Sequence, residues 1–154
     1  MPWTMLAAIA AMMSPQPNLT NPCAGDTTPE ADACAEQFLA KANAELKRYT
    51  IVARRQVENL VRSENADKPP DAFKAPTLAD FDKAVEAWQA YRDAECHAVL
   101  DKWSDGTIAT VKSADCKTRL TRLRTHMIWQ NWLHIDGGGG PDILPEPLMT
   151  GPIG

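Results

Sequence analysis

The sequence predicts an all-α fold, an antiparallel bundle of three main helices stapled by two disulfides. Apolar side chains recur at steps of three and four residues in three long segments, which is the period of an amphipathic helix. Proline-rich and glycine-rich stretches separate these segments. No segment keeps the alternation of apolar and polar residues that marks a half-buried strand. A chain of 154 residues is long enough for one domain with a core.

The first helix is expected to begin at Thr28-Pro29-Glu30. There a capping hydroxyl precedes a proline at the first helical position and an acid in the first turn. The helix can run to Glu64, and residues 65–76, NADKPPDAFKAP, then form a loop with three prolines. Its apolar positions are Cys34, Phe38, Ala42, Leu46, Tyr49, Ala53, Val57 and Leu60.

The second helix is expected to follow Thr77–Asp80, which resembles a capping box with Asp in place of the usual Glu. The turn-forming stretch Ser104–Thr107 ends it. The apolar residues of this helix are Phe81, Val85, Trp88, Tyr91, Val99 and Trp103.

The third helix is expected to begin near Thr110 and to stop at residues 136–141, DGGGGP. The residues expected to face the core are Ala114 or Cys116, then Leu120, Leu123 and Met127, with Trp132 near the end.

The two ends of the chain differ from the helical part, residues 21–135. No charged side chain precedes Asp26, and Trp3–Met13 is an apolar run that is too short to span a bilayer. We therefore expect residues 1–20 to be a signal peptide, although it lacks the usual Lys or Arg before the apolar run. Residues 136–154 are expected to be a Gly/Pro-rich mobile tail. The tail residues that can dock on the domain are Ile143, Leu144, Leu148 and Met149.

The four cysteines agree with export to an oxidising compartment. No C-x-x-C, Cys/His zinc pattern or haem motif accompanies them, so disulfides are favoured over a metal or another cofactor. Four cysteines allow three pairings. Cys23 and Cys34 lie on either side of the first helix start, where a short chain reversal can join them. Cys96 and Cys116 lie at the same level of a hairpin that turns near Gly106, so we predict bridges Cys23–Cys34 and Cys96–Cys116.

Charge and motifs argue against several classes of function. The net charge is −4, and on a helix the one basic run, Lys117–His126, divides its charges between two faces. Neither favours nucleic acid. The three histidines lack metal-ligand spacing, and no Ser-His-Asp motif or phosphate loop appears. Asp93 and Glu95 could serve acid–base chemistry, but nothing in the sequence distinguishes an acid from a base between them. We expect no catalytic residue and no bound metal.

The segment Ala84–Cys96, AVEAWQAYRDAEC, is followed by the turn Asp105–Thr107 and by Cys116–Thr125, CKTRLTRLRT. Together they resemble the LprI-type lysozyme inhibitor family of exported bacterial proteins, and the resemblance extends from Cys23 to Trp132. Val85 stands where the family has Gln, and Asp-Gly-Thr replaces Gly-Gly-Ser. The matching positions are Trp88, Tyr91, Arg92, Asp93, Cys96, Cys116, Thr121 and Arg124.

These matching residues can be scaffold or binding surface. Trp88 and Tyr91 are three residues apart, and we expect them to fill the core beside Leu120 and Leu123 rather than contact a ligand.

Arg92 and Asp93 point about 100° apart on a helix, so they are not expected to form a tight pair. We expect Asp93 to pair instead with Arg124 of the third helix, as a structural clamp. In the first helix, Asn43 and Lys47 replace the family's usual Asp and Asn.

The resemblance implies an exported binding protein, periplasmic or secreted, that inhibits lysozyme or another muramidase by docking rather than by catalysis. The alternative is a cell-envelope interaction or structural module with no lysozyme target. A third hypothesis, an enzyme acting on cell-wall material, would require turnover that depends on Asp93 or Glu95, and we expect none. We expect no nucleic-acid partner and no membrane span, and the sequence leaves the oligomeric state open. Acidic residues that would attract a basic enzyme are Glu36, Glu45, Glu58 and Asp82.

Overall fold

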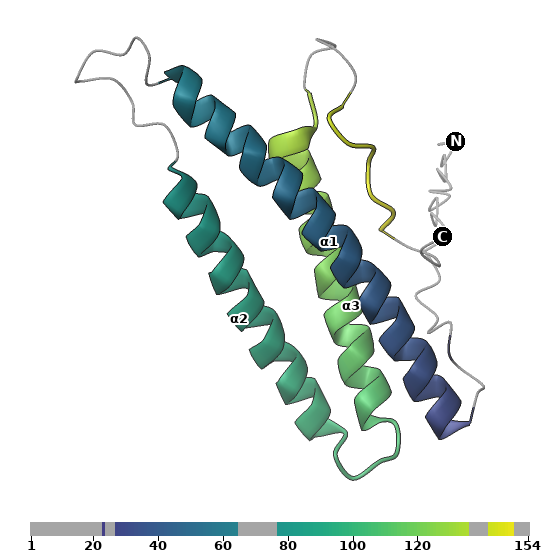
Figure 1. Ribbon diagram of the computed structural model, residues 1–154. Coiled ribbons are helices and arrows are strands. Elements are labelled where there is room, and N and C mark those ends of the chain that lie inside the picture. Colours follow the sequence, from purple (N-terminus) through teal and green to yellow (C-terminus); the bar gives the residue numbers. More distant parts are fainter. Residues whose placement is uncertain (1–22, 24–26, 65–76, 136–141, 150–154) are drawn as a thin grey trace, which may run out of the picture.

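Three long helices make up the computed structural model, which describes residues 23, 27–64, 77–135 and 142–149 (Figure 1). Successive helices run antiparallel, and α3 packs against both others. The described residues contain no strand, which confirms the predicted all-α fold. In chain order the elements are α1 (Thr28–Glu64), α2 (Leu78–Lys102), α3 (Ala109–Ile128) and a π-helical turn, η1 (Trp129–Leu133).

Local hydrogen bonds explain where α1 and α2 begin. At α2 the Thr77 hydroxyl accepts from Asp80 N (3.1 Å) and the Asp80 carboxylate accepts from Thr77 N (3.2 Å), which confirms the predicted capping box. At α1 the Glu30 carboxylate accepts from the backbone N (3.1 Å) and the hydroxyl (2.6 Å) of Thr27. Glu30 thus bonds to Thr27, which is one residue before Thr28, the residue expected to cap the helix. Both carboxylates lie at the positive end of a helix dipole.

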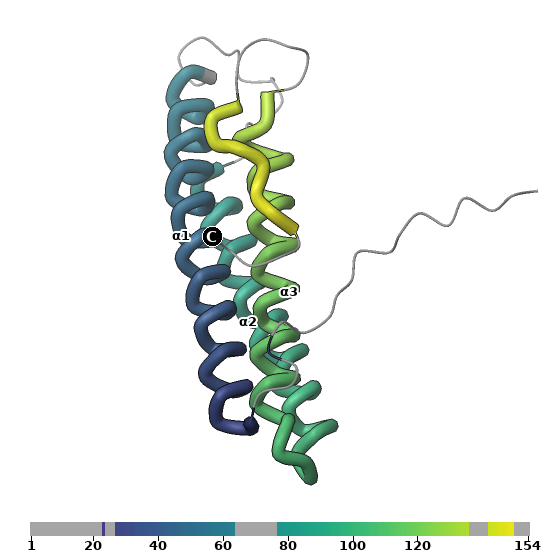
Figure 2. The backbone as a smooth tube through the Cα atoms, turned by 90° about the vertical axis from the view of Figure 1, so that its right-hand side faces the viewer, coloured from purple at the N-terminus to yellow at the C-terminus, as the bar shows by residue number. Residues whose placement is uncertain are grey.

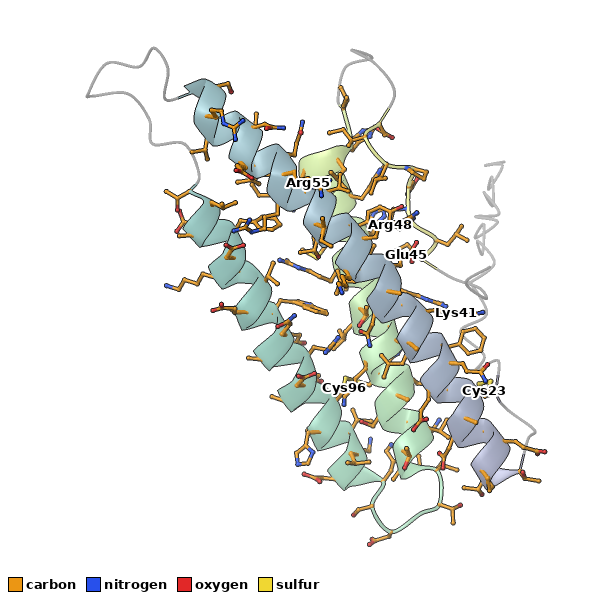
Figure 3. All side chains as sticks on the ribbon, in the orientation of Figure 1. Cys23, Lys41, Glu45, Arg48, Arg55 and Cys96 are labelled. Atoms are coloured by element: carbon orange, nitrogen blue, oxygen red, sulfur yellow. A yellow bond between two sulfur atoms is a disulfide. The ribbon has the colours of Figure 1, made fainter. Side chains whose placement is uncertain are left out.

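One face of α1 supplies much of the core, as its apolar spacing predicts. The main core cluster joins this face to α2, the end of α3 and η1. Leu60, near the end of α1, is 42% exposed and is an exception to the prediction. Charged side chains follow the remaining surface of α1, among them Lys41, Glu45, Arg48 and Arg55 (Figure 3). The buried residues of the cluster are Leu46, Tyr49, Ala53, Val57, Phe81, Ile128, Trp129 and Leu133.

The buried face of α3 differs from the predicted one. Leu123 (45% exposed) and Met127 (43%) point to solvent, although their spacing predicted a core position. The face that contacts both neighbours carries mainly small and hydroxyl side chains, which let helix axes approach closely. The Thr125 hydroxyl is satisfied within the helix, because it donates to the backbone oxygen of Thr121 (2.9 Å). The buried residues of α3 are Val111, Ser113, Ala114, Cys116, Thr118, Thr121, Thr125 and Ile128.

Both predicted disulfides are present. Cys23–Cys34 ties the segment before α1 to the second turn of that helix, with Cα atoms 5.8 Å apart. Cys96–Cys116 joins α2 to α3, with Cα atoms 5.6 Å apart. Cys23 lies outside α1 and Cys96 on α2 (Figure 3). The second bridge lies close to a buried hydrogen bond from the Ser113 hydroxyl to the backbone oxygen of Cys96 (3.0 Å), so the hairpin register is held twice.

The C-terminal segment Asp142–Met149 packs along α1 and α3 (Figure 2). The Tyr49 hydroxyl donates to the backbone oxygen of Pro145 (2.7 Å), and Trp129 Nε1 donates to that of Leu144 (2.9 Å). The Leu144 side chain also packs against the core. The segment therefore docks on the domain, as was expected to be possible for Leu144, because two buried aromatic side chains find their hydrogen-bond partners there.

Several sequence-based predictions lie outside the described residues. They are the signal peptide at 1–20, the loop at 65–76 and the tail residues 136–141 and 150–154. In the part of the chain that the structure describes, no helix is both long and apolar enough to cross a membrane.

Candidate functional site

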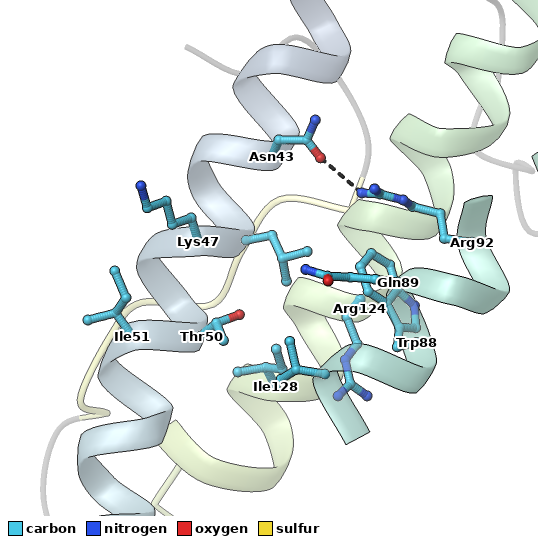
Figure 4. Close-up of a pocket in the computed structure, with 11 residues that line it drawn as sticks. Asn43, Lys47, Thr50, Ile51, Trp88, Gln89, Arg92, Arg124 and Ile128 are labelled. Carbon is cyan, nitrogen blue, oxygen red and sulfur yellow. Dashed lines mark hydrogen bonds between the residues drawn. The ribbon is translucent and has the colours of Figure 1, made fainter. Parts of the chain in front are cut away.

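A groove opens between α1 and α2, and α3 contributes to its wall (Figure 4). We call it the α1/α2 groove. Its cavity measures about 410 Å³, within the range of about 300–1,000 Å³ typical of ligand pockets. Three of the residues that the family resemblance singled out line it. The lining residues are Asn43, Leu46, Lys47, Thr50, Ile51, Val85, Trp88, Gln89, Arg92, Arg124 and Ile128.

Arg92 connects all three helices. Its Nη1 donates to Asn43 Oδ1 on α1 (3.1 Å) and to Thr121 Oγ1 on α3 (3.3 Å). Its Nε (3.1 Å) and Nη2 (3.0 Å) face Asp93 Oδ1 on its own helix. The Arg92 side chain is only 16% exposed, so these contacts satisfy a largely buried charge.

Asp93 therefore has a different partner from the predicted Arg124. On the helix the Cβ atoms of Arg92 and Asp93 do point in different directions. The Arg92 side chain is nevertheless long enough to bend back and reach the Asp93 carboxylate. The Asp93 side chain is 59% exposed, so this ion pair is of the surface kind.

Trp88 packs against the main core cluster and lies beside two guanidinium groups. The Arg92 Cζ is 5.0 Å from its ring centroid and the Arg124 Cζ is 6.0 Å from it. Tyr91 is not in the core, because it is 55% exposed. Of the two aromatic residues expected beside Leu120 and Leu123, only Trp88 is part of the bundle interior.

Arg124 is the unusual member of the site. Its Nε is inaccessible to solvent and has no hydrogen-bond partner, and among the described residues no carboxylate pairs with it. Burial lowers the pKa of Arg124 from its ordinary value, with no opposing charge to offset the effect.

The electrostatic character of the groove is opposite to that of the whole chain. Lys47, Arg92 and Arg124 line it, and none of its eleven lining residues is acidic. The protein as a whole carries a net charge of −4. The groove can therefore attract an anion, whereas Asp93 and Glu95 do not line it. No group of three or more potential metal ligands occurs among the described residues.

The α1 side of the groove was not predicted from the sequence. Asn43, Lys47 and Thr50 line it, and the first two were noted only as departures from a family pattern. Their spacing of three and four residues places them on one helical face, which is the signal that could have indicated a shared surface.

Fold and site together define a small, disulfide-stapled bundle of three helices with a basic groove. Residues 20–127 match the family model of the lysozyme inhibitor LprI, and the chain belongs to this family. It is also 31% identical over 97 residues to the uncharacterised protein R02472 of Rhizobium meliloti (strain 1021). That match covers 62% of this chain and 67% of the relative. No solved structure matches the chain.

Proposed function

We propose that this protein is an exported inhibitor of lysozyme or another muramidase, which it blocks by docking rather than by catalysis. The observation that carries the proposal is the family match, which spans most of the three helices. Two disulfides suit an oxidising compartment outside the cytoplasm. A domain held rigid by such bridges loses little conformational freedom when it docks.

We further propose that the turn between α2 and α3 is the part that enters the enzyme. An inhibitor that blocks a cleft must insert a convex element, and this turn forms one end of the bundle, beyond the start of α1 (Figure 2). Trp103 (39% exposed) and Ile108 (42%) lie on it as exposed large apolar residues. The bridge Cys96–Cys116 holds the two helices that carry it. Aromatic residues in such positions are frequent anchors of protein interfaces.

The two lysines beside Trp103 suit the chemistry of a muramidase cleft, while Asp101 and Asp105 lie in the same stretch of chain. Glycoside hydrolases place two carboxyl groups on either side of the scissile bond. The ammonium groups of Lys102 and Lys112 lie 5.9 and 5.5 Å from the ring centroid of Trp103, so an apolar ring and two cations are presented together. A cation offered to a desolvated carboxylate in the cleft would add attraction and fix the orientation.

The first test is residual muramidase activity with titrated, oxidised protein, using c-type, g-type and i-type lysozymes at two salt concentrations. We expect saturable inhibition of at least one class that weakens at high salt, because charges contribute to association. If every class stays fully active, the proposal is wrong, and the cell-envelope interaction module becomes the better hypothesis.

The docking element is tested separately with Trp103→Ala. We expect this change to weaken inhibition about tenfold or more, because a buried interface aromatic is a typical hot spot. Leu123→Ala is the matched control, since Leu123 is equally apolar and 45% exposed but lies on the body of α3. Equal inhibition by both variants would show that another surface docks.

A further inference from the structure

The α1/α2 groove holds more positive charge than its surroundings neutralise. Arg92 uses its donors on Asn43, Thr121 and Asp93. Arg124 has no hydrogen bond or ion pair among the described residues, although its Nε is buried. The buried Nε costs free energy, and because it is closed to solvent, a ligand in the groove can bind only the Nη groups of Arg124, which have no hydrogen-bond partner among the described residues.

A second arginine shows that burial alone does not single out Arg124. Arg122 Nε is also buried without a partner. However, Glu45 is close enough to raise the pKa of Arg122 against the lowering effect of burial, and Arg122 does not line the groove. Arg124 is the lining cation that combines a buried Nε with the absence of an acidic partner among the described residues.

Apolar and aromatic side chains form part of the groove wall, beside the polar Asn43, Thr50 and Gln89. Leu46, Val85 and Ile128 line it beside Trp88, while Lys47 lies on the α1 side (Figure 4). Pockets that combine an apolar wall with a few placed polar groups are those that bind small organic molecules. The arginine fork matches the two oxygens of a carboxylate in a bidentate arrangement.

We propose that the α1/α2 groove is a binding site for a small organic anion, with its carboxylate on Arg124 and its apolar body against Leu46, Val85 and Trp88. The site is separate from the docking turn between α2 and α3, so its ligand and the muramidase can bind at the same time. Failure of this proposal leaves the proposed inhibition unaffected.

The probe pair is benzoate and benzamide, which have nearly the same shape and differ in charge. Titrations at constant ionic strength are followed through the side-chain N–H signals of Arg124 and Trp88 in proton–nitrogen NMR spectra. We expect benzoate to shift the Arg124 Nε–H signal saturably and to bind about tenfold or more tighter than benzamide. Inorganic phosphate should bind more weakly than benzoate, because it has no apolar body.

Three variants separate a binding role from a structural one. Arg124→Gln should weaken benzoate about tenfold or more, and Arg124→Lys should weaken it less, because the charge stays while the fork is lost. Arg119→Gln is the matched control, since Arg119 is exposed on α3 and does not line the groove. The melting temperature of Arg124→Gln should equal or exceed that of the wild type, because an unpaired buried charge is removed.

Three results would overturn the proposal. They are equal affinity for benzoate and benzamide, equal affinity for benzoate and phosphate, and benzoate binding that survives Arg124→Gln. A clear fall in melting temperature for both Arg124 variants, with no NMR response of Arg124 in the wild type, would likewise identify Arg124 as structural.

Discussion

Arg92 shows what a single side chain contributes here, because its guanidinium group is bonded to residues of all three helices. The family motif that contains it therefore includes at least one residue with a structural task. Arg124, on the same groove, lacks such contacts. The two arginines of the family motif thus differ in their hydrogen-bond partners.

The first residue-scale prediction concerns Arg92. We expect Arg92→Gln to lower the free energy of unfolding by about 2 kcal/mol, because hydrogen bonds from a largely buried charge to two other helices are lost. Urea unfolding measures the change. Asp93→Asn is the control and should cost less than about 1 kcal/mol, since its ion pair is exposed. Equal losses for the two variants would contradict the bridging role of Arg92.

The second residue-scale prediction concerns Asp115. Burial raises the pKa of Asp115 above its usual value of 3.8, although Lys112 and Arg119 lower it. The folded state then binds more protons than the unfolded state between the two pKa values, so this group's contribution to stability falls as pH rises through that window. Asp115→Asn should therefore raise the melting temperature near pH 7 and change it little near pH 3.

Asp82 is the control of opposite sign. Its hydrogen bond with Arg54 (2.8 Å) lowers the pKa of Asp82. The contribution of Asp82 to the free energy of unfolding is therefore present above the pKa of the unfolded state, and it is lost as the pH falls through the pKa of the folded state. Asp82→Asn should lower the melting temperature near pH 7. A rise for Asp82→Asn, or a fall for Asp115→Asn, would contradict these assignments.

At the scale of elements, the C-terminal segment Asp142–Met149 packs on the helices although it has no regular secondary structure. Asp142 Oδ1 accepts from Ile135 N (2.9 Å) and lies 2.8 Å from His134 Nδ1, so the segment is held where it begins. The contacts of Tyr49 and Trp129 hold its middle. The segment thus lies over one side of the core, where its backbone oxygens accept hydrogen bonds from the buried side chains of Tyr49 and Trp129.

We expect Tyr49→Phe to lower the free energy of unfolding by about 1 kcal/mol, because the part-buried hydrogen bond to the backbone oxygen of Pro145 is lost. Limited proteolysis of the segment should become faster in this variant. The chain's other tyrosine gives the control: Tyr91→Phe should change neither quantity, since Tyr91 is 55% exposed. A segment cleaved at the same rate in both variants would show that Tyr49 does not hold it.

At the scale of the whole molecule, the two disulfides restrain different parts of the bundle. Cys96–Cys116 spans a sequence separation of 20 and restrains the α2–α3 hairpin, whereas Cys23–Cys34 spans 11 and restrains the start of α1. The proposed docking turn belongs to the first of these units. Stability and inhibition are therefore expected to depend on the two bridges differently.

Replacing Cys96 and Cys116 together by Ser should lower the free energy of unfolding by about 3 kcal/mol and weaken muramidase inhibition. The double replacement of Cys23 and Cys34 by Ser is the control. It should cost less stability, because its loop is shorter, and should leave inhibition unchanged for the fraction of protein that is folded. Loss of inhibition in the control alone would place the docking surface near the start of α1.

Local patterns in the sequence by themselves determined the three helices, the capping box at Thr77 and both disulfides. Hydrophobic period, caps and hairpin geometry depend on residues that are close along the chain or on a single turn. Membership of the lysozyme inhibitor family was also evident from the motif around Trp88, and the family match confirms it.

Only the tertiary structure decided which face of α3 is buried and which partners the charged groups of the long side chains contact. A helix that contacts two neighbours favours small residues at the contact, so Thr121 and Thr125 are buried while Leu123 and Met127 are exposed. Arg92 bends back to Asp93, and Arg124 keeps an unused donor, because the partners of a long side chain depend on all three helices at once. Contacts between residues that are far apart in the chain produce no periodic pattern in the sequence, so they could not be predicted from it.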